Sequence, residues 1–239
     1  MQLEAITWQR MAERLAGHLD ERGAAPGQQA GQQAGQQTGQ QAGPEAGQEA
    51  GQPAWQRVGI DGAPAAGTGV LAGELADALR LRGRSVLVVP AGGFLRPASL
   101  RFEFGREDVD SYLGGWYDTA ALWREVFGPT DPGGTGRVLP DLWDPATDRA
   151  TRSPYAELPP DGVVIVHGPL LLGHWFPFDL SVHVRLSPGA LARRTEESAR
   201  WTLPAFERYE AETDPASLAD AVVRADDPRH PAWTGIRAG

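Results

Sequence analysis

One stretch, residues 57–82, constrains the fold of this chain more than any other. Residues 58–60, Val-Gly-Ile, predict a short buried strand, and residues 61–69 form a loop rich in Gly and Ala. Apolar residues then recur at the spacing of one helix face: Leu71, Leu75, Ala78 and Leu79. A strand, a glycine-rich turn and a helix form an anion-binding unit, because the N–H groups at the helix start point outward and the helix dipole favours phosphate there.

The loop matches the phosphate-binding motif G-x-x-x-x-G-K-[ST] in its glycines but not in its chemistry. Gly62 and Gly67 stand at the two glycine positions, whereas Thr68 replaces the Lys and Gly69 replaces the Ser or Thr. The missing Lys would reach the phosphates, and the missing hydroxyl would hold Mg²⁺. The same residues also suit an ordinary strand-to-helix turn. The candidate phosphate- or nucleotide-binding loop comprises Asp61, Gly62, Ala63, Ala66, Gly67, Thr68 and Gly69.

The composition excludes several classes of chemistry. The chain has 22 basic residues, all of them Arg, so no lysine contacts a phosphate, forms a Schiff base or acts as a general base. Any cationic contact to phosphate must come from Arg or be replaced by backbone N–H groups. The absence of Cys excludes disulfides and a thiol nucleophile. The net charge of −9 argues against a nucleic-acid partner, which generally requires a basic face.

Targeting signals are not evident in the sequence. The longest apolar run, residues 163–172, is too short to cross a membrane and contains His167. The first residues lack the basic and apolar regions of a signal peptide. We therefore predict a cytoplasmic protein without a membrane partner.

The chain divides into three predicted parts. Residues 1–22 form an amphipathic helix, which we expect to dock on the core in preference to a partner. Residues 23–53 contain Gly at every fourth position from 27 to 51, with Gln and Ala between, and predict a flexible linker because they have little to bury. Residues 54–239 form the main domain.

Short apolar strands alternate with helices in the main domain. Predicted strands occupy residues 85–90, 138–143, 161–167, 180–186 and 221–225. Predicted helices occupy residues 118–127, 188–200 and 204–212, and residues 91–106 form a loop. This alternation predicts an α/β fold with a central parallel sheet flanked by helices.

Five segments, taken in order over residues 57–231, resemble the uridine kinase-like P-loop nucleoside kinases, especially their actinobacterial members. VGIDGAPAAGTG resembles the phosphate loop, and VVPAGGFLRP resembles a strand followed by Asp-Asp-Phe-His-Arg-Pro. SYLGGWYDTAALWREV resembles a Tyr-Asp segment before a helix. LPPDGVVIVHGPLLL resembles a Walker B-like strand, and FDLSVHVRLSPGALARR resembles a strand and lid helix. The resemblance implies a P-loop nucleoside/nucleotide kinase fold.

The same resemblance implies a set of site residues and four departures from the family pattern. Thr68 and Gly69 replace the phosphate-binding Lys and the metal-binding hydroxyl, Gly92-Gly93 replaces an acidic pair, and His167 replaces the acid after the Walker B-like strand. The implied substrate pocket comprises Gly92, Phe94, Arg96, Arg101, Tyr117, Asp118 and His167, and the implied lid carries Arg193, Arg194 and Arg200. Phe94 and Tyr117 fit ordinary core packing equally well.

These observations favour a catalytically degenerate uridine kinase-like protein that binds a small-molecule ligand: a nucleoside, a nucleotide or another phosphorylated compound. The alternatives are an active ATP-dependent uridine/cytidine 5′-kinase with altered machinery and a non-catalytic interaction module. No catalytic residue is assigned, and no cofactor is certain, with ATP and Mg²⁺ expected if the chain is active. No metal site is predicted, because His167, His174 and His183 lack the spacing of a zinc motif. The oligomeric state stays open.

Overall fold

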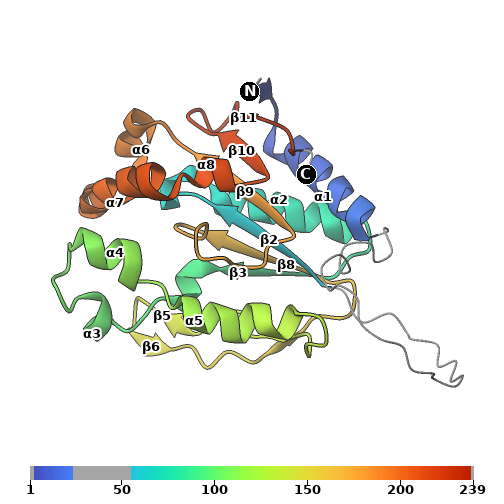
Figure 1. Ribbon diagram of the computed structural model, residues 1–239, viewed down its shortest axis with the longest axis horizontal. Helices are drawn as coiled ribbons and strands as arrows, with labels where there is room; N and C mark the ends of the chain where they lie inside the picture. Colours follow the sequence, from blue (N-terminus) through green and yellow to red (C-terminus); the bar gives the residue numbers. More distant parts are fainter. Residues whose placement is uncertain (1–2, 24–54, 238–239) are drawn as a thin grey trace, which may run out of the picture.

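The computed structural model describes residues 3–23 and 55–237. Its central sheet has seven strands, in the spatial order β1 (Glu4–Ala5), β11 (Ala232–Trp233), β10 (Ala221–Arg224), β9 (Leu180–Arg185), β2 (Gln56–Asp61), β8 (Val163–Gly168) and β3 (Val86–Pro90) (Figure 1). The five strands from β10 to β3 pair in parallel, and β11 and β1 extend one edge in antiparallel fashion. The predicted α/β class is confirmed, with a sheet that is mostly parallel.

Helices cover both faces of the sheet (Figure 1). One face packs against α1 (Trp8–Gly23) and α2 (Thr68–Leu81), and the other against α5 (Thr119–Leu122) and the helical turn Trp123–Phe127 that continues it. Strand β8 shows why the sequence runs apolar without alternation: Val163 and Ile165 face the first layer, while Val164 and Val166 face the second. A strand buried on both faces has no position for a solvent-facing polar residue.

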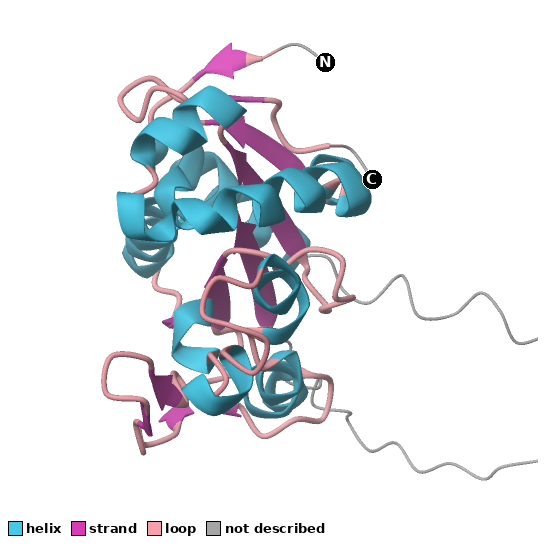
Figure 2. Cartoon of the chain, turned by 90° about the vertical axis from the view of Figure 1, so that its left-hand side faces the viewer, coloured by secondary structure: helices cyan, strands magenta, loops and turns pink. Residues whose placement is uncertain are grey.

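A third apolar cluster lies at the carboxyl end of the parallel strands. It joins α4 (Val109–Gly115), α7 (Leu203–Arg208) and the turn Tyr209–Thr213 around edge-to-face rings of Tyr112, Phe206 and Trp201. The neighbouring helices α3 (Ala98–Arg101), α6 (Pro188–Arg194) and α8 (Pro215–Leu218) are short. Except for α8, which precedes β10, these helices stand in front of the carboxyl ends of the strands (Figures 1 and 2). They therefore position side chains around any ligand bound there.

The N-terminal helix is part of the core. Met11, Leu15 and Leu19 of α1 are fully buried in the same cluster as α2, and β1 pairs with β11. The Gln56 amide donates a hydrogen bond to the Leu19 carbonyl at 2.8 Å, so the end of α1 lies beside the start of β2. The predicted flexible linker, residues 23–53, lies almost wholly outside the described residues.

Several predicted elements have different bounds. Residues 138–143 do not form one strand, because Pro140 separates β4 (Arg137–Val138) from β5 (Trp143–Asp144), which pair with β7 (Ala156–Glu157) and β6 (Arg149–Ala150). The predicted helix 188–200 ends with α6, since Thr195 takes an extended conformation, and Glu197–Thr202 form a 3₁₀ turn. The predicted helix 1–22 begins only at Trp8. Residues 91–106, predicted as a loop, include the 3₁₀ turn Ala91–Phe94 and α3.

None of the helices in residues 3–23 and 55–237 combines the length and apolarity that crossing a bilayer requires.

Candidate functional site

The parallel register brings the candidate polar residues to one edge of the sheet. His167 on β8 pairs with Ile60 on β2 and with Pro90 on β3. Asp61, the last residue of β2, pairs with His183 on β9. The carboxyl ends of neighbouring parallel strands are the usual ligand-binding edge of an open α/β sheet.

The predicted phosphate loop, residues 61–69, leads from the end of β2 into α2 with the backbone geometry that its glycines predict. A Cβ at Gly62 would lie 2.5 Å from the Val184 carbonyl oxygen, so only Gly fits. Gly67 has φ +87° and precedes the helix as its N-cap residue, without a side-chain cap. The α2 N-terminus is thus left to its backbone N–H groups, which favour an anion.

His167 lies beside the two residues that depart from the motif. Its Nδ1 is 3.4 Å from the Thr68 hydroxyl, which makes this at best a weak hydrogen bond. Its Cε1 would be 3.3 Å from a Cβ at position 69, so the absence of a side chain at Gly69 leaves room for the ring. Burial lowers the pKa of His167 below its ordinary value, so the ring is neutral at pH 7. The structure therefore brings together Thr68, Gly69 and His167, but supplies no positive charge from them.

Asp61 begins a chain of charged side chains, called here the buried charge chain, made of Asp61, His183, Glu210 and Arg185. Asp61 and His183 are buried, and Glu210 and Arg185 are partly exposed. The Asp61 Oδ1 accepts the Leu171 N–H at 2.8 Å, and its Oδ2 lies 2.7 Å from His183 Nδ1. The other ring nitrogen, Nε2, is 2.9 Å from Glu210 Oε1, and the second Glu210 oxygen is 3.0 Å from Arg185 Nε. The His183 side chain is 2% exposed and that of Asp61 is fully buried.

The imidazole at the centre of this chain carries a proton at neutral pH. Burial acts to lower the pKa of His183, but the hydrogen bonds and charges of Asp61 and Glu210 outweigh it and raise that pKa to about 9. Both ring nitrogens of His183 then donate, one to each carboxylate. Nearby, burial raises the pKa of Tyr209, whose hydroxyl accepts the Leu172 N–H at 3.0 Å. The buried charge chain thereby connects the end of β2, where the phosphate loop starts, to the turn that follows α7.

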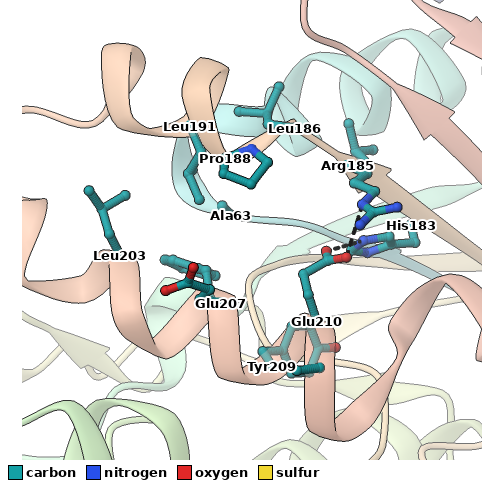
Figure 3. Close-up of a pocket in the computed structure, with 13 residues that line it drawn as sticks. Ala63, His183, Arg185, Leu186, Pro188, Leu191, Leu203, Glu207, Tyr209 and Glu210 are labelled. Atoms are coloured by element: carbon teal, nitrogen blue, oxygen red, sulfur yellow. Dashed lines mark hydrogen bonds and ion pairs between the residues drawn. The ribbon is translucent and has the colours of Figure 1, made fainter.

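A cavity of about 510 Å³ opens beside this chain, with Ala63 of the phosphate loop in its wall (Figure 3). Its other walls come from the end of β9, the start of α6, and α7 with the turn after it. The lining residues are Ala63, His183, Val184, Arg185, Leu186, Pro188, Leu191, Leu203, Phe206, Glu207, Tyr209, Glu210 and Ala211. Its wall is mainly apolar, with its charged groups on β9, on α7 and on the turn after it.

The substrate pocket implied by the resemblance starts at the end of β3. Gly92 has open space around its Cα, whereas a Cβ at Gly93 would lie 2.8 Å from Asp141 Cβ. Asp141, which accepts a hydrogen bond from the Ser153 hydroxyl at 2.7 Å, therefore occupies the space where an acidic residue at position 93 would project. Phe94 is fully buried in the cluster around α5. The backbone N–H of Arg96 donates to the Trp116 carbonyl.

The remaining residues of that predicted pocket have structural contacts. Arg101 is 5% exposed, with its guanidinium 4.9 Å and 5.1 Å from the ring centroids of Phe102 and Trp116, and its Nε donates to the Arg96 carbonyl at 2.7 Å. Asp118 caps α5 by accepting the Ala121 N–H at 2.9 Å. Burial raises the pKa of Tyr117. These contacts support local structure, and the predicted ligand contacts of these residues stay predictions.

The three lid arginines do not gather at one point. Arg194 donates to the Asp226 carbonyl at 2.6 Å, and Arg200 pairs with Glu197 at 2.6 Å on the surface. Arg193 is exposed. No group of three or more His, Asp or Glu side chains in the described part of the chain has the arrangement of a metal site.

Sequence reasoning missed the buried charge chain and Asp141. One signal pointed to the first: His183 interrupts the apolar run of β9, and a polar residue in a strand buried on both faces must have buried partners. Those partners, Asp61 and Glu210, come from elements far apart in the sequence. Asp141 carried no such signal, because it lies in an irregular segment whose path the sequence does not specify.

No protein-family model matches the sequence. No curated protein matches it either. A solved structure described as a possible uridine kinase from Bacillus stearothermophilus has a TM-score of 0.58 and 22% identity, over 71% of this chain and 88% of that one. A "putative fructose transport system kinase" from Silicibacter sp. TM1040 has a TM-score of 0.47 and 24% identity, over 70% of this chain and 87% of that one. The first similarity shows that this chain has the fold of the uridine kinase-like P-loop kinases.

Proposed function

We propose that this chain binds the phosphate groups of a nucleotide, or of another phosphorylated ligand, at the phosphate loop, and that it transfers phosphate very slowly or not at all. The observation that carries the proposal is the start of α2, where an uncapped helix N-terminus is combined with Thr68 and Gly69 in place of Lys and Ser or Thr. Backbone N–H groups and the helix dipole bind phosphate there, with Arg in support.

Catalysis needs more than this binding. Phosphoryl transfer depends on positioning and on neutralising charge with cations and Mg²⁺. Mg²⁺ requires oxygen ligands in near-octahedral geometry. The residues at the phosphate loop do not fit it, because Gly69 has no hydroxyl, His167 has no carboxylate, and the Asp61 carboxylate is hydrogen bonded to His183 and Leu171. We therefore derive no metal-assisted step.

The runner-up function, an active nucleoside kinase with altered machinery, has one observation in its favour. The neutral His167 ring is close to Thr68 at the loop, in the position where the family resemblance implies an acid. A neutral imidazole accepts a proton from a substrate hydroxyl, which is the task of a general base. The replacement of the phosphate-binding Lys by Thr68 and of the metal-binding hydroxyl by Gly69 favours the first function.

Ligand binding is tested by the melting temperature with ATP, GTP, uridine and cytidine, with and without Mg²⁺. A ligand with a Kd of about 0.1 mM adds roughly 1.4 kcal/mol at about 1 mM. We expect such a rise in melting temperature with ATP or GTP, nearly independent of Mg²⁺.

The Gly69→Asp variant places a carboxylate where the phosphate would bind and should abolish the ligand-induced rise in melting temperature. Gly73→Asp, one turn further along α2 in an exposed position, is the matched control and should retain it. Identical shifts in the two variants, or none in the wild type, would refute binding at the loop.

Catalysis is tested by a coupled assay on the wild type with a panel of nucleosides and small alcohols. Turnover should lie far below the roughly 1 s⁻¹ at the lower end for kinases. Thr68→Lys alone should not rescue it, because the metal ligand and the acid are still missing. A wild-type turnover near 1 s⁻¹ would establish the runner-up function, and loss of that turnover in His167→Gln would then identify the base.

A further inference from the structure

The cavity beside the phosphate loop has the size of a small-molecule site. Its volume of about 510 Å³ lies within the roughly 300–1,000 Å³ typical of ligand pockets. The apolar part of its wall comes from the end of β9, from α6 and from α7: Leu186, Pro188, Leu191, Leu203 and Phe206. Such a wall favours a ligand with an apolar body. The polar groups of the wall determine which charge the ligand can carry.

Most polar groups of the wall already have partners. Glu210 uses both oxygens, one on His183 and the other on Arg185. The second nitrogen of the His183 ring is held by Asp61, and the Tyr209 hydroxyl contacts the Leu172 backbone. The two positive groups, His183 and Arg185, are therefore matched by the carboxylates of Asp61 and Glu210.

Glu207 is the exception. It lies on α7 one turn before Glu210, and its carboxylate projects into the cavity opposite Pro188 and Leu191 (Figure 3). It makes no hydrogen bond or ion pair with any other residue in the described part of the chain. Glu207 is exposed, so the mouth of the cavity presents one solvated negative charge beside an apolar wall.

We propose that this cavity binds an organic monocation, an amine with an apolar body, whose ammonium group pairs with Glu207. The apolar body lies against Leu191, Leu203 and Phe206, so that burial and a charge-assisted hydrogen bond act together. A divalent metal ion does not fit, because one carboxylate on an apolar wall lacks the six or more oxygen ligands that such ions take. An anion is disfavoured by Glu207. The proposal does not depend on phosphate binding at the loop.

The test compares three probes of similar size: phenethylamine, 2-phenylethanol and phenylacetate, titrated into the full chain at pH 7 by calorimetry. An ion pair with an exposed carboxylate contributes roughly 0.2–1 kcal/mol, so the amine should bind up to about fivefold more tightly than the alcohol. Phenylacetate should bind more weakly than the alcohol.

Two variants with equal charge change locate the site. Glu207→Gln should weaken amine binding by up to about fivefold and leave 2-phenylethanol unchanged. Glu103→Gln, in the exposed turn after α3, should leave both unchanged. Leu203→Trp, which fills the cavity from its partly exposed rim, should weaken all binding. Equal affinities for amine and alcohol, equal effects of the two glutamine variants, or no binding of the amine would each overturn the proposal.

Discussion

On the β8 side of the phosphate loop, His167 lies 3.4 Å from Thr68, partly exposed and neutral. On the β9 side, His183 is held at 2.7 and 2.9 Å between two carboxylates, buried and protonated. The two rings stand at the carboxyl ends of strands that flank β2 on either side. One strand end therefore has loose contacts that a ligand can replace, and the other has contacts that are already satisfied.

This difference in hydrogen bonding implies different roles for the His167 side and the His183 side of the loop. A side chain whose hydrogen bonds are all satisfied within the protein before a ligand arrives makes the local structure rigid, because it has no donor or acceptor left for the ligand. A group with weak contacts stays free to change partners. The buried charge chain therefore holds the start of the phosphate loop against the turn after α7, while the His167 side keeps weak contacts that, under the proposed function, a ligand would replace.

The largest expected effect comes from breaking the buried charge chain. His183→Leu leaves the carboxylates of Asp61 and Glu210 without their shared cation, and removing one partner of a buried ion pair costs about 3–5 kcal/mol. His167→Leu should cost less than about 1 kcal/mol, because its ring is partly exposed and weakly bonded. Urea unfolding measures both. A similar loss in the two variants would mean that the two sides do not differ as described.

The pH dependence of stability sharpens the same contrast. The folded-state pKa of His183, about 9, lies above the ordinary value of about 6.5 expected in the unfolded chain. Its contribution is therefore complete below about pH 6.5, decreases as the pH rises, and is lost above pH 9. The difference corresponds to roughly 3 kcal/mol.

The amino-acid composition limits the number of other groups that could change the stability in this pH range. The sequence has no Lys and no Cys, and burial lowers the pKa of His167 and His174 below the ordinary value, so these groups do not add a titration between pH 6.5 and 9. We expect the unfolding free energy of the wild type to fall across this window and that of His183→Leu to stay nearly flat. A wild-type stability that rises toward pH 9 would contradict a protonated His183.

The α/β architecture could be predicted from the local pattern of apolar residues and glycines in the sequence. The candidate site could be predicted only in part. The apolar runs of β2, β8 and β9 reveal a doubly covered sheet, and the glycines at 62 and 67 reveal the turn. The family resemblance singled out Thr68, Gly69 and His167 as departures, but that Thr68 lies beside His167 is a finding of the structure. The pairing of His183 with Asp61 and Glu210 did not follow, because it depends on how the turn after α7 packs over β9. Helix ends such as that at Thr195 depend on single residues leaving the helical conformation, which periodicity does not encode.

The smallest expected effect tests the weak side directly. Thr68→Val keeps the branched shape of the side chain and removes the hydroxyl that lies 3.4 Å from His167 Nδ1. Thr68 is buried, but Val keeps its packing, and because a contact of that length is a poor hydrogen bond, the loss of stability should stay below about 0.5 kcal/mol. The pKa of His167 should stay below its ordinary value, because its cause is burial and not the hydroxyl. Urea unfolding and an NMR titration of the His167 ring measure the two quantities. A loss of about 3 kcal/mol would show instead that Thr68 and His167 form a structural pair as strong as the buried charge chain, and would leave no loosely held side for a ligand to occupy.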